Sequence, residues 1–345
     1  PLRGEAAEKL RVMAAQAPGE LKDYAAWPTA AIDGPGGAVA AAVMPRAEEP
    51  FDIHAVYSPR DRADDLPHAN WKFLVTTAQN LCAAFHAAHQ AGAIIGDVNH
   101  GSVRVAADGR VRLIDCDSFQ VRQGGRVFRC PVGVDAYTPP ELQGAKLADV
   151  TRTEDHDRFG LAVLIFQLLF MGRHPFSGVP VASDAPTDIP AAIARRAYAY
   201  RSAGAILKPP PSAPPIAMVS PRLAELFERA FLASGNRPTA IEWHAELALF
   251  ADTLSACGRN PAHQTPAHLA ECPWCMFAKA GVEFFPSVGG AAASGEQIDL
   301  LALKEVVARI SRLPQLPSAP AQILGPFGTL SNQLEARLRA AKLKA

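Results

Sequence analysis

The sequence predicts an α+β fold, with short strands in the first part of the chain and helices in the rest. Between Ala93 and Val121, short apolar runs alternate with turn residues such as Asp108-Gly109, which is typical of small hairpins. A buried helix from Phe159 and helical patterns over residues 221–232 and 239–256 follow. Strands that precede a mostly helical part indicate the α+β class.

The residues before Ala93 add a helix, a hairpin and a second helix. Residues 4–16 repeat apolar side chains at helical intervals. Residues 30–44 predict two short strands around a Gly/Pro turn. From Trp71 to Ala91 the chain has a long helical pattern, which Gly92 ends.

Composition excludes several classes of function. The 345 residues include 34 Lys and Arg against 34 Asp and Glu, so there is no global basic field for nucleic acid or anionic lipid. The longest apolar run, Leu161–Met171, is about half as long as a bilayer requires, which predicts a buried helix and no membrane span. The first 16 residues lack the apolar block of a signal peptide, so we expect a cytoplasmic protein.

Two aspartates lie at neighbouring strand ends. Asp97 follows the apolar run AII, and Asp115 ends the run VRLID, so the two carboxylates can face one cleft. Phosphoryl transfer uses such a pair, because one carboxylate orients the attacking hydroxyl and the other holds the magnesium ion that neutralises the phosphates. Taken singly, each aspartate is explained better as a solvated turn residue.

The spacing of further motifs resembles that of protein kinases. Asp97 and Ser102 are separated as the Asp and Asn of H-R-D-x-x-x-x-N, and Asp115 falls where the Asp of D-F-G would. Three later elements follow in kinase order, similar to A-P-E, to the start of the buried helix F and to the late R-P-T/S element: Thr138–Glu141, His156–Gly160 and Arg237–Thr239.

The resemblance implies roles for individual residues. Asp97 would be the catalytic residue that orients the acceptor hydroxyl, while Asp115 and Ser102 would bind the Mg²⁺ or Mn²⁺ ion of ATP. Glu8, or Glu5, resembles the helix C glutamate that pairs with a nucleotide-binding lysine.

Two structural roles are also implied. Glu141 should form a buried ion pair with Arg237, and Asp157 should cap the backbone of the catalytic loop. These residues report on the fold and not on the chemistry.

The chain also departs from the kinase pattern. Ile95-Gly96 replaces the His-Arg before the catalytic Asp, so no arginine at this point can receive an activation-loop phosphate, and we do not expect switching by that route. Asp115-Cys116-Asp117 replaces D-F-G, and Ser102 is a shorter, weaker ligand than Asn. Neither a G-x-G-x-x-G loop nor a V-A-I-K-like strand precedes the first helix, so we expect a truncated N-lobe.

A Cys/His cluster follows the last long helical pattern. Cys257, His263, Cys272 and Cys275 offer three thiolates and one imidazole, the donor set that tetrahedral zinc prefers. Four protein ligands leave no open position, so we expect a structural Zn²⁺ site in preference to free thiols. His268 is an alternative fourth ligand, although it is explained better as a solvated loop residue.

The phrases IIGDVNHGS, LIDCDSFQV, YTPPELQG and CPWC together resemble a bacterial kinase-like family, a protein kinase domain sometimes joined to a helix-hairpin-helix element. The resemblance covers residues 1 to about 280. It implies the following division of the chain: a partial N-lobe from helix C onward (1–45), a mostly helical C-lobe (46–256), a small zinc element (257–280), and a linker with a helical tail (281–345).

The family also implies partners. Its genes often accompany a metal-dependent protein phosphatase and a von Willebrand A domain protein, as in tellurite-resistance-type systems, which implies signalling by reversible Ser/Thr phosphorylation. Within the tail we expect a short helix over 298–311. Ile323–Gly328 is a degenerate version of a helix-hairpin-helix, so DNA binding is only weakly indicated.

Two classes of function follow. In the first, the protein is an ATP- and magnesium-dependent Ser/Thr kinase. In the second, it is a pseudokinase scaffold that binds partner proteins or nucleotide without turnover, which Ser102, Gly96 and the D-C-D sequence favour. The retained pair of carboxylates favours the kinase, because a scaffold is free to lose it.

Overall fold

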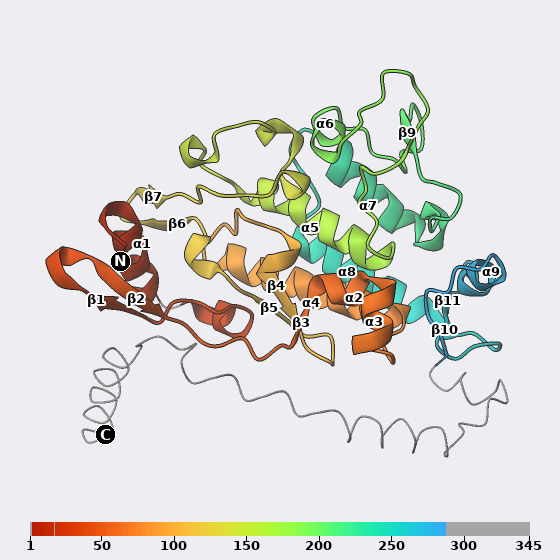
Figure 1. Ribbon diagram of the computed structural model, residues 1–345, viewed down its shortest axis with the longest axis horizontal. Coiled ribbons are helices and arrows are strands. Elements are labelled where there is room, and N and C mark those ends of the chain that lie inside the picture. Colours follow the sequence, from red (N-terminus) through yellow and green to blue (C-terminus); the bar gives the residue numbers. More distant parts are fainter. Residues whose placement is uncertain (1, 17, 288–345) are drawn as a thin grey trace, which may run out of the picture. The chain divides into compact units, whose positions relative to one another are not determined.

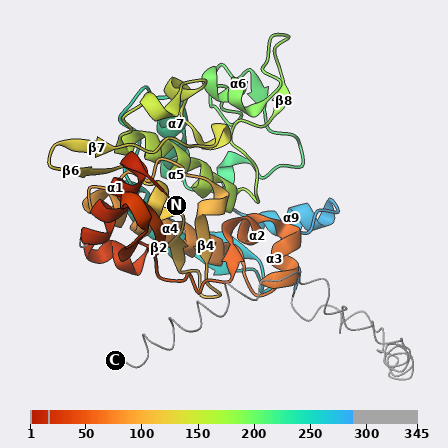
Figure 2. The same ribbon diagram turned by 60° about the vertical axis from the view of Figure 1, so that its left-hand side comes forward.

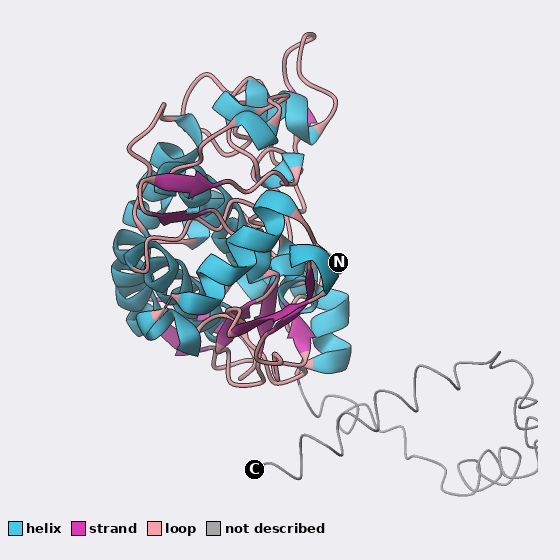
Figure 3. Ribbon diagram, turned by 90° about the vertical axis from the view of Figure 1, so that its left-hand side faces the viewer, coloured by secondary structure: helices cyan, strands magenta, loops and turns pink. Residues whose placement is uncertain are grey.

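A computed structural model describes residues 2–16 and 18–287. The helix expected over 298–311 and the segment 323–328 lie outside the described residues. The described strands are short and lie between helices, as Figure 3 shows, which agrees with the α+β class.

The first helix packs on a hairpin at one side of the molecule (Figure 1). Helix α1 (Gly4–Ala15) buries Ala7 and Leu10 against Val39 of the antiparallel pair β1 (Ala30–Asp33) and β2 (Val39–Val43). Both elements were predicted from the sequence, and both are confirmed.

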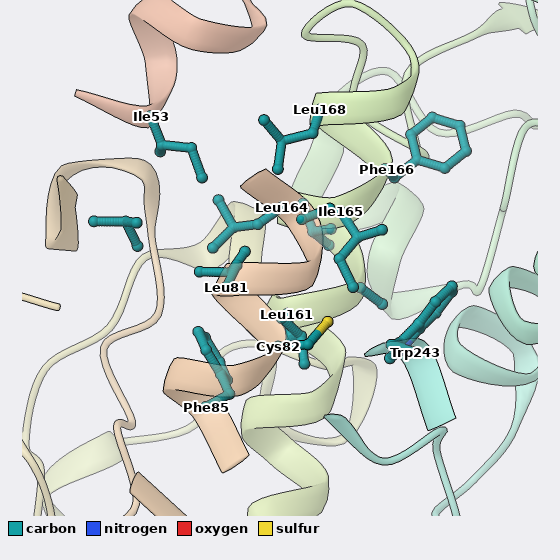
Figure 4. Close-up of a cluster of buried hydrophobic side chains, with 14 of the residues drawn as sticks. Ile53, Leu81, Cys82, Phe85, Leu161, Leu164, Ile165, Phe166, Leu168 and Trp243 are labelled. Atoms are coloured by element: carbon teal, nitrogen blue, oxygen red, sulfur yellow. The ribbon is translucent and has the colours of Figure 1, made fainter. Parts of the chain in front are cut away.

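The buried helix is the centre of the core. Helix α5 (Glu154–Leu169) is enclosed from Phe159 onward, and it packs against α4 (Trp71–Gln90) and α7 (Pro221–Leu232), as Figure 4 shows for part of the cluster. It begins at a capping box in which Thr153 and His156 satisfy each other's backbone N–H groups. None of the described helices is long and apolar enough to cross a membrane.

The other described α-helices surround this core. Helix α8 packs along α4, and the short helices α2 and α3 precede α4 in the sequence. Their bounds are α2 Ile53–Tyr57, α3 Pro59–Asp65, α6 Ile189–Ala194, α8 Ala240–Thr253 and α9 Pro273–Lys279.

The strands form separate small sheets. The largest has the antiparallel order β3-β4-β5, and Gly109, at a φ of 84°, closes the predicted turn between β4 and β5. The remaining strands pair as hairpins or short ladders. The bounds are β3 Phe51–Asp52, β4 Val103–Val105, β5 Val111–Leu113, β6 Val121–Gln123, β7 Arg126–Phe128, β8 Val179–Pro180, β9 Leu207–Lys208, β10 Leu254–Ala256 and β11 Gln264–Pro266.

The helix predicted over 239–256 ends earlier than expected. Residues Leu254–Ala256 leave the helix and pair with Gln264–Pro266. The apolar pattern continues through these residues, but their pairing in a hairpin with the strand that follows determines their conformation.

The predicted ion pair between Glu141 and Arg237 is present, but only its arginine is buried, since the Glu141 side chain is 34% exposed. Arg237 is fully buried, and its Nη1 and Nη2 donate to the two carboxylate oxygens of Glu141 at 2.8 and 2.9 Å. Asp155 adds a second carboxylate, which also accepts the Arg237 backbone N–H at 2.8 Å. The pair therefore ties the segment before α5 to the segment before α8.

His174 is buried beside the same part of the core. Its Nε2 donates to the Ala136 carbonyl at 2.8 Å, and its Nδ1 accepts the Phe176 N–H at 3.2 Å. Burial lowers the pKa of His174 to about 4, against a smaller rise from the Ala136 carbonyl. Protonation at Nδ1 would also place two donors against each other.

We expect His174 to make stability depend on pH. Between pH 6.5 and about 4 the unfolded histidine binds a proton that the folded one does not, so the free energy of unfolding should fall as the pH falls, by up to about 3 kcal/mol. His174→Gln keeps a donor for Ala136 but does not titrate, so its decline should be shallower. Urea unfolding followed by Trp fluorescence at several pH values measures this, and parallel curves for both proteins would contradict it.

Candidate functional site

A buried carboxylate fixes the loop that carries Asp97, which we call the Asp97 loop (residues 94–102). Asp157, on α5, is 1% exposed and accepts the backbone N–H groups of Ile95 and Gly96, both at 2.8 Å. His89 lies 3.0 Å from the same carboxylate. The predicted capping of this loop by Asp157 is confirmed.

Asn99 orients the carboxylate of Asp97. Its Nδ2 donates to the Asp97 carbonyl at 3.0 Å and to Asp97 Oδ1 at 3.2 Å, while its Oδ1 accepts the Gly101 N–H at 2.7 Å. Asn99 was not among the site residues predicted from the sequence. Asn with Gly two positions later could have indicated a turn-forming side chain, but not its bond to Asp97.

Ser102 lies at the end of the Asp97 loop and is buried. Its hydroxyl donates to the Asn99 carbonyl at 2.9 Å and accepts the Asn99 N–H at 3.3 Å. The Ser102 carbonyl accepts the Ile114 N–H at 3.0 Å, which ties the loop to the end of β5. Because these bonds occupy the hydroxyl, metal binding by Ser102 would have to compete with them, and it stays a prediction.

Asp115 adopts a conformation that is uncommon outside glycine. Its φ of 57° and ψ of 32° lie in the left-handed region, where it precedes a 3₁₀ turn over Cys116–Ser118. Burial raises the pKa of Asp115, and the negative charges of Asp117 and Asp97 add to that rise. The structure therefore brings Asp97 and Asp115 within range of each other's charge, and Asp117, which the sequence analysis did not assign, lies with them.

Helix α1 contacts this region through Lys9. Glu8 forms an ion pair with Arg126 of β7 at 2.6 Å, and both side chains are half-exposed. The adjacent Lys9 is buried and donates to the Ser118 carbonyl at 2.8 Å. Nucleotide-site pairing by Glu8 stays a prediction.

The burial of the charged Lys9 side chain was not predicted from the sequence. Burial lowers the pKa of Lys9, while the nearby acidic groups, with Cys130 first and Asp117 next, oppose the shift. Sequence reasoning missed this residue because lysine is rarely buried.

The Cys/His cluster is assembled as predicted. One ligand atom from each of Cys257, His263, Cys272 and Cys275 lies within 4.8 Å of the others. The Cys257 and Cys275 sulfurs are 3.7 Å apart, and His263 Nδ1 is 3.4 Å from the Cys275 sulfur. Sulfur atoms about 3.8 Å apart fit tetrahedral bonds of about 2.3 Å to zinc. His268 instead lies 2.9 Å from the Ala217 carbonyl, so it is not the fourth member.

The cluster is attached to the helical core. His263 Nε2, on the side away from the sulfurs, lies 3.4 Å from Glu283 Oε1, the kind of partner that orients a ligating histidine. Trp274, between the last two cysteines, packs edge-on against Trp71 of α4 with ring centres 4.9 Å apart. All of this fits a structural zinc site, and occupancy by zinc stays a proposal.

Comparison with known proteins supports a bacterial protein-kinase-like family for this chain. No family model matches it. Two curated relatives, each named Protein kinase YegI, from Escherichia coli strain K12 and Escherichia coli O157:H7, are 43% identical to it over 289 residues. The aligned region is 82% of this chain and 45% of each relative, so the chain spans about half the length of the curated relatives it matches.

We expect the purified protein to carry about one zinc ion per chain, as structural four-ligand sites do. His263→Gln should lower the zinc content and the Tm, because it removes one ligand of the four. His268→Gln is the matched control, since that histidine lies nearby but bonds Ala217. Metal analysis and thermal melts decide the matter, and equal zinc in both variants would show that the cluster does not hold the metal.

Proposed function

Since the chain is similar to proteins named protein kinases over most of its length, we propose that it is the catalytic part of an ATP- and Mg²⁺-dependent Ser/Thr protein kinase in a bacterial signalling system. The observation that carries the proposal is the main-chain bond from Ile114 to Ser102, which joins the loops of Asp97 and Asp115 and so supports a shared site for the two carboxylates. A carboxylate pair held on rigid backbone is what phosphoryl transfer requires.

Asp97 would act on the acceptor hydroxyl. Asn99 engages its Oδ1, so Oδ2 would orient the hydroxyl and receive its proton. Because Asp157 and Asn99 fix the loop and the carboxylate separately, little reorganisation is needed when a substrate arrives.

Asp115 would hold the divalent ion. Burial and, to a smaller extent, the charges of Asp117 and Asp97 raise the pKa of Asp115, and a cation bound at this carboxylate would offset both effects. The ion, Mg²⁺ or Mn²⁺, would supply charge neutralisation at the β- and γ-phosphates of ATP. Ser102 and Glu8 remain proposed contributors to metal and nucleotide binding.

The division into lobes is part of the proposal. Helix α1 and the β1–β2 hairpin form a separate small hydrophobic cluster, which supports a partial N-lobe over 1–45. The C-lobe would run over 46–256, the zinc element over 257–280 and the tail over 281–345. Figure 2 shows the β6–β7 hairpin beside α1, so the two proposed lobes meet near the candidate site.

The proposed substrates and location follow from the family resemblance. A protein kinase acts on protein hydroxyl groups, and the family resemblance suggests a von Willebrand A domain protein as substrate and a metal-dependent phosphatase as its antagonist. A cytoplasmic location would suit such a system. The pseudokinase scaffold is the alternative, and the similarity to named kinases does not favour it.

We expect the full-length protein to transfer the γ-phosphate of ATP in the presence of Mg²⁺ or Mn²⁺. Asp97→Asn and Asp115→Asn should each lower the rate about 10²–10⁴-fold, because each removes a charge that acts on the transferred group or its acceptor. Asp108→Asn, which changes an exposed turn residue bonded to Arg110, should leave the rate unchanged.

Radiolabelled ATP with a generic protein substrate provides the measurement. A rate that is equal in wild type and both site variants, or no transfer by a folded, zinc-loaded protein, would overturn the kinase proposal and favour the scaffold.

A further inference from the structure

A buried arginine joins the Asp97 loop to the segment that follows Asp115. We call residues 119–140 the connecting segment. Arg152 is 3% exposed, and its guanidinium donates to the carbonyls of Gly96, in the Asp97 loop, and Val132, in the connecting segment. Its backbone is held by Gln120, which accepts the Arg152 N–H at 2.8 Å and donates to the Arg152 carbonyl at 2.9 Å.

The surrounding backbone makes room for this side chain. A Cβ atom at Gly96, whose φ is 73°, would lie 2.7 Å from Cys130 Cβ. A Cβ atom at Gly133 would lie 2.9 Å from Arg152 Nη2. Glycine at both positions therefore allows the Asp97 loop and the connecting segment to approach the guanidinium. The bonds from Arg152 to two carbonyls help to offset the cost of burying its charge.

Lys9 holds the same segment at a second point. Its Nζ donates to the Ser118 carbonyl at 2.8 Å and, at 3.5 Å, to the Arg129 carbonyl. The two buried cations thus bind main-chain carbonyls at Arg129 and Val132, in the middle of the segment, and at Ser118, the residue just before it.

The connecting segment has no accessible hydroxyl to modify. Between Phe119 and Ala136 the sequence contains no Ser, Thr or Tyr. Tyr137 and Thr138 follow, but both are buried, and their hydroxyls donate to Gln167 Oε1 at 3.1 Å and to the Val134 carbonyl at 2.9 Å. A phosphate on this segment is therefore not available to order it.

We propose that Arg152 is a positioning residue that holds the connecting segment against the Asp97 loop, so that the enzyme is active without phosphorylation of that segment. The inference rests on the proposed kinase function. Arg152 lies 56 residues after Gly96 in the sequence. Ile95-Gly96 contain no cationic side chain, and Arg152 instead supplies the positive charge that links the two segments.

The test compares three variants of the full-length protein. Arg152→Met removes both side-chain bonds, Arg152→Lys can keep one, and Arg129→Met is the matched control, because the Arg129 side chain is exposed and bonds only Thr151. We expect Arg152→Met to lower kcat at least about tenfold with little change in KM for ATP, since misplaced catalytic groups slow the chemical step. Arg152→Lys should recover part of the loss, and Arg129→Met should match wild type.

A second measurement does not depend on activity. Hydrogen exchange of the backbone amides at 126–134 should be faster in Arg152→Met than in wild type or Arg129→Met, because the segment loses its anchor. Unchanged exchange in Arg152→Met would overturn the proposal. If wild type transfers no phosphate, the kinase proposal fails, while faster exchange in Arg152→Met alone would still support the anchoring role.

The regulatory part has its own test. Wild-type protein treated with a broad-specificity phosphatase, then freed of it, should show the same initial rate and no lag. A lag or a loss of rate that preincubation with ATP restores would overturn the proposed independence from phosphorylation.

Discussion

The bond between the Asp157 carboxylate and the backbone of Ile95 and Gly96 is the constraint on which the candidate site depends. A carboxylate that is 1% exposed is stable only if donors surround it, and here two N–H groups and His89 do so. Because α5 is enclosed by α4 and α7, it cannot shift without repacking the core. The Asp97 loop therefore takes its position from the buried helix at the centre of the core.

The positive and the negative side chains near the Asp97 loop have different roles. The buried cations Lys9 and Arg152 donate to main-chain carbonyls, so they order the backbone. The Asp115 carboxylate instead has its pKa raised by burial and, in addition, by the negative charges of Asp117 and Asp97. Because these two cations bond to backbone carbonyls, the carboxylates can attract a metal cation from solution. Phosphoryl transfer with a divalent metal ion requires such carboxylates.

Local sequence patterns predicted the parts of this structure that depend on local physics. The helical periods of residues 4–16 and 71–91, the turn at Asp108-Gly109 and the C-x₂-C end of the metal cluster were all identified from these patterns. The capping by Asp157 was implied by the resemblance to protein kinases. Arg152 and Lys9 could not be found in this way, because a bond to a distant carbonyl leaves no periodic signal in sequence. The early end of α8 was missed because the apolar pattern continues into Leu254–Ala256, where hairpin pairing with β11 replaces the helix.

Helix α5 also connects the candidate site to the Cys/His cluster. Asp157 lies in its first turn, and the Leu169 carbonyl at its other end accepts the indole N–H of Trp71 at 3.1 Å. Trp71 in turn packs against Trp274 of the cluster. Twelve residues of helix separate the two attachments by about 18 Å. The cluster and the Asp97 loop are therefore attached to opposite ends of one buried helix, so a change at the cluster would reach the Asp97 loop through α5 and the core around it.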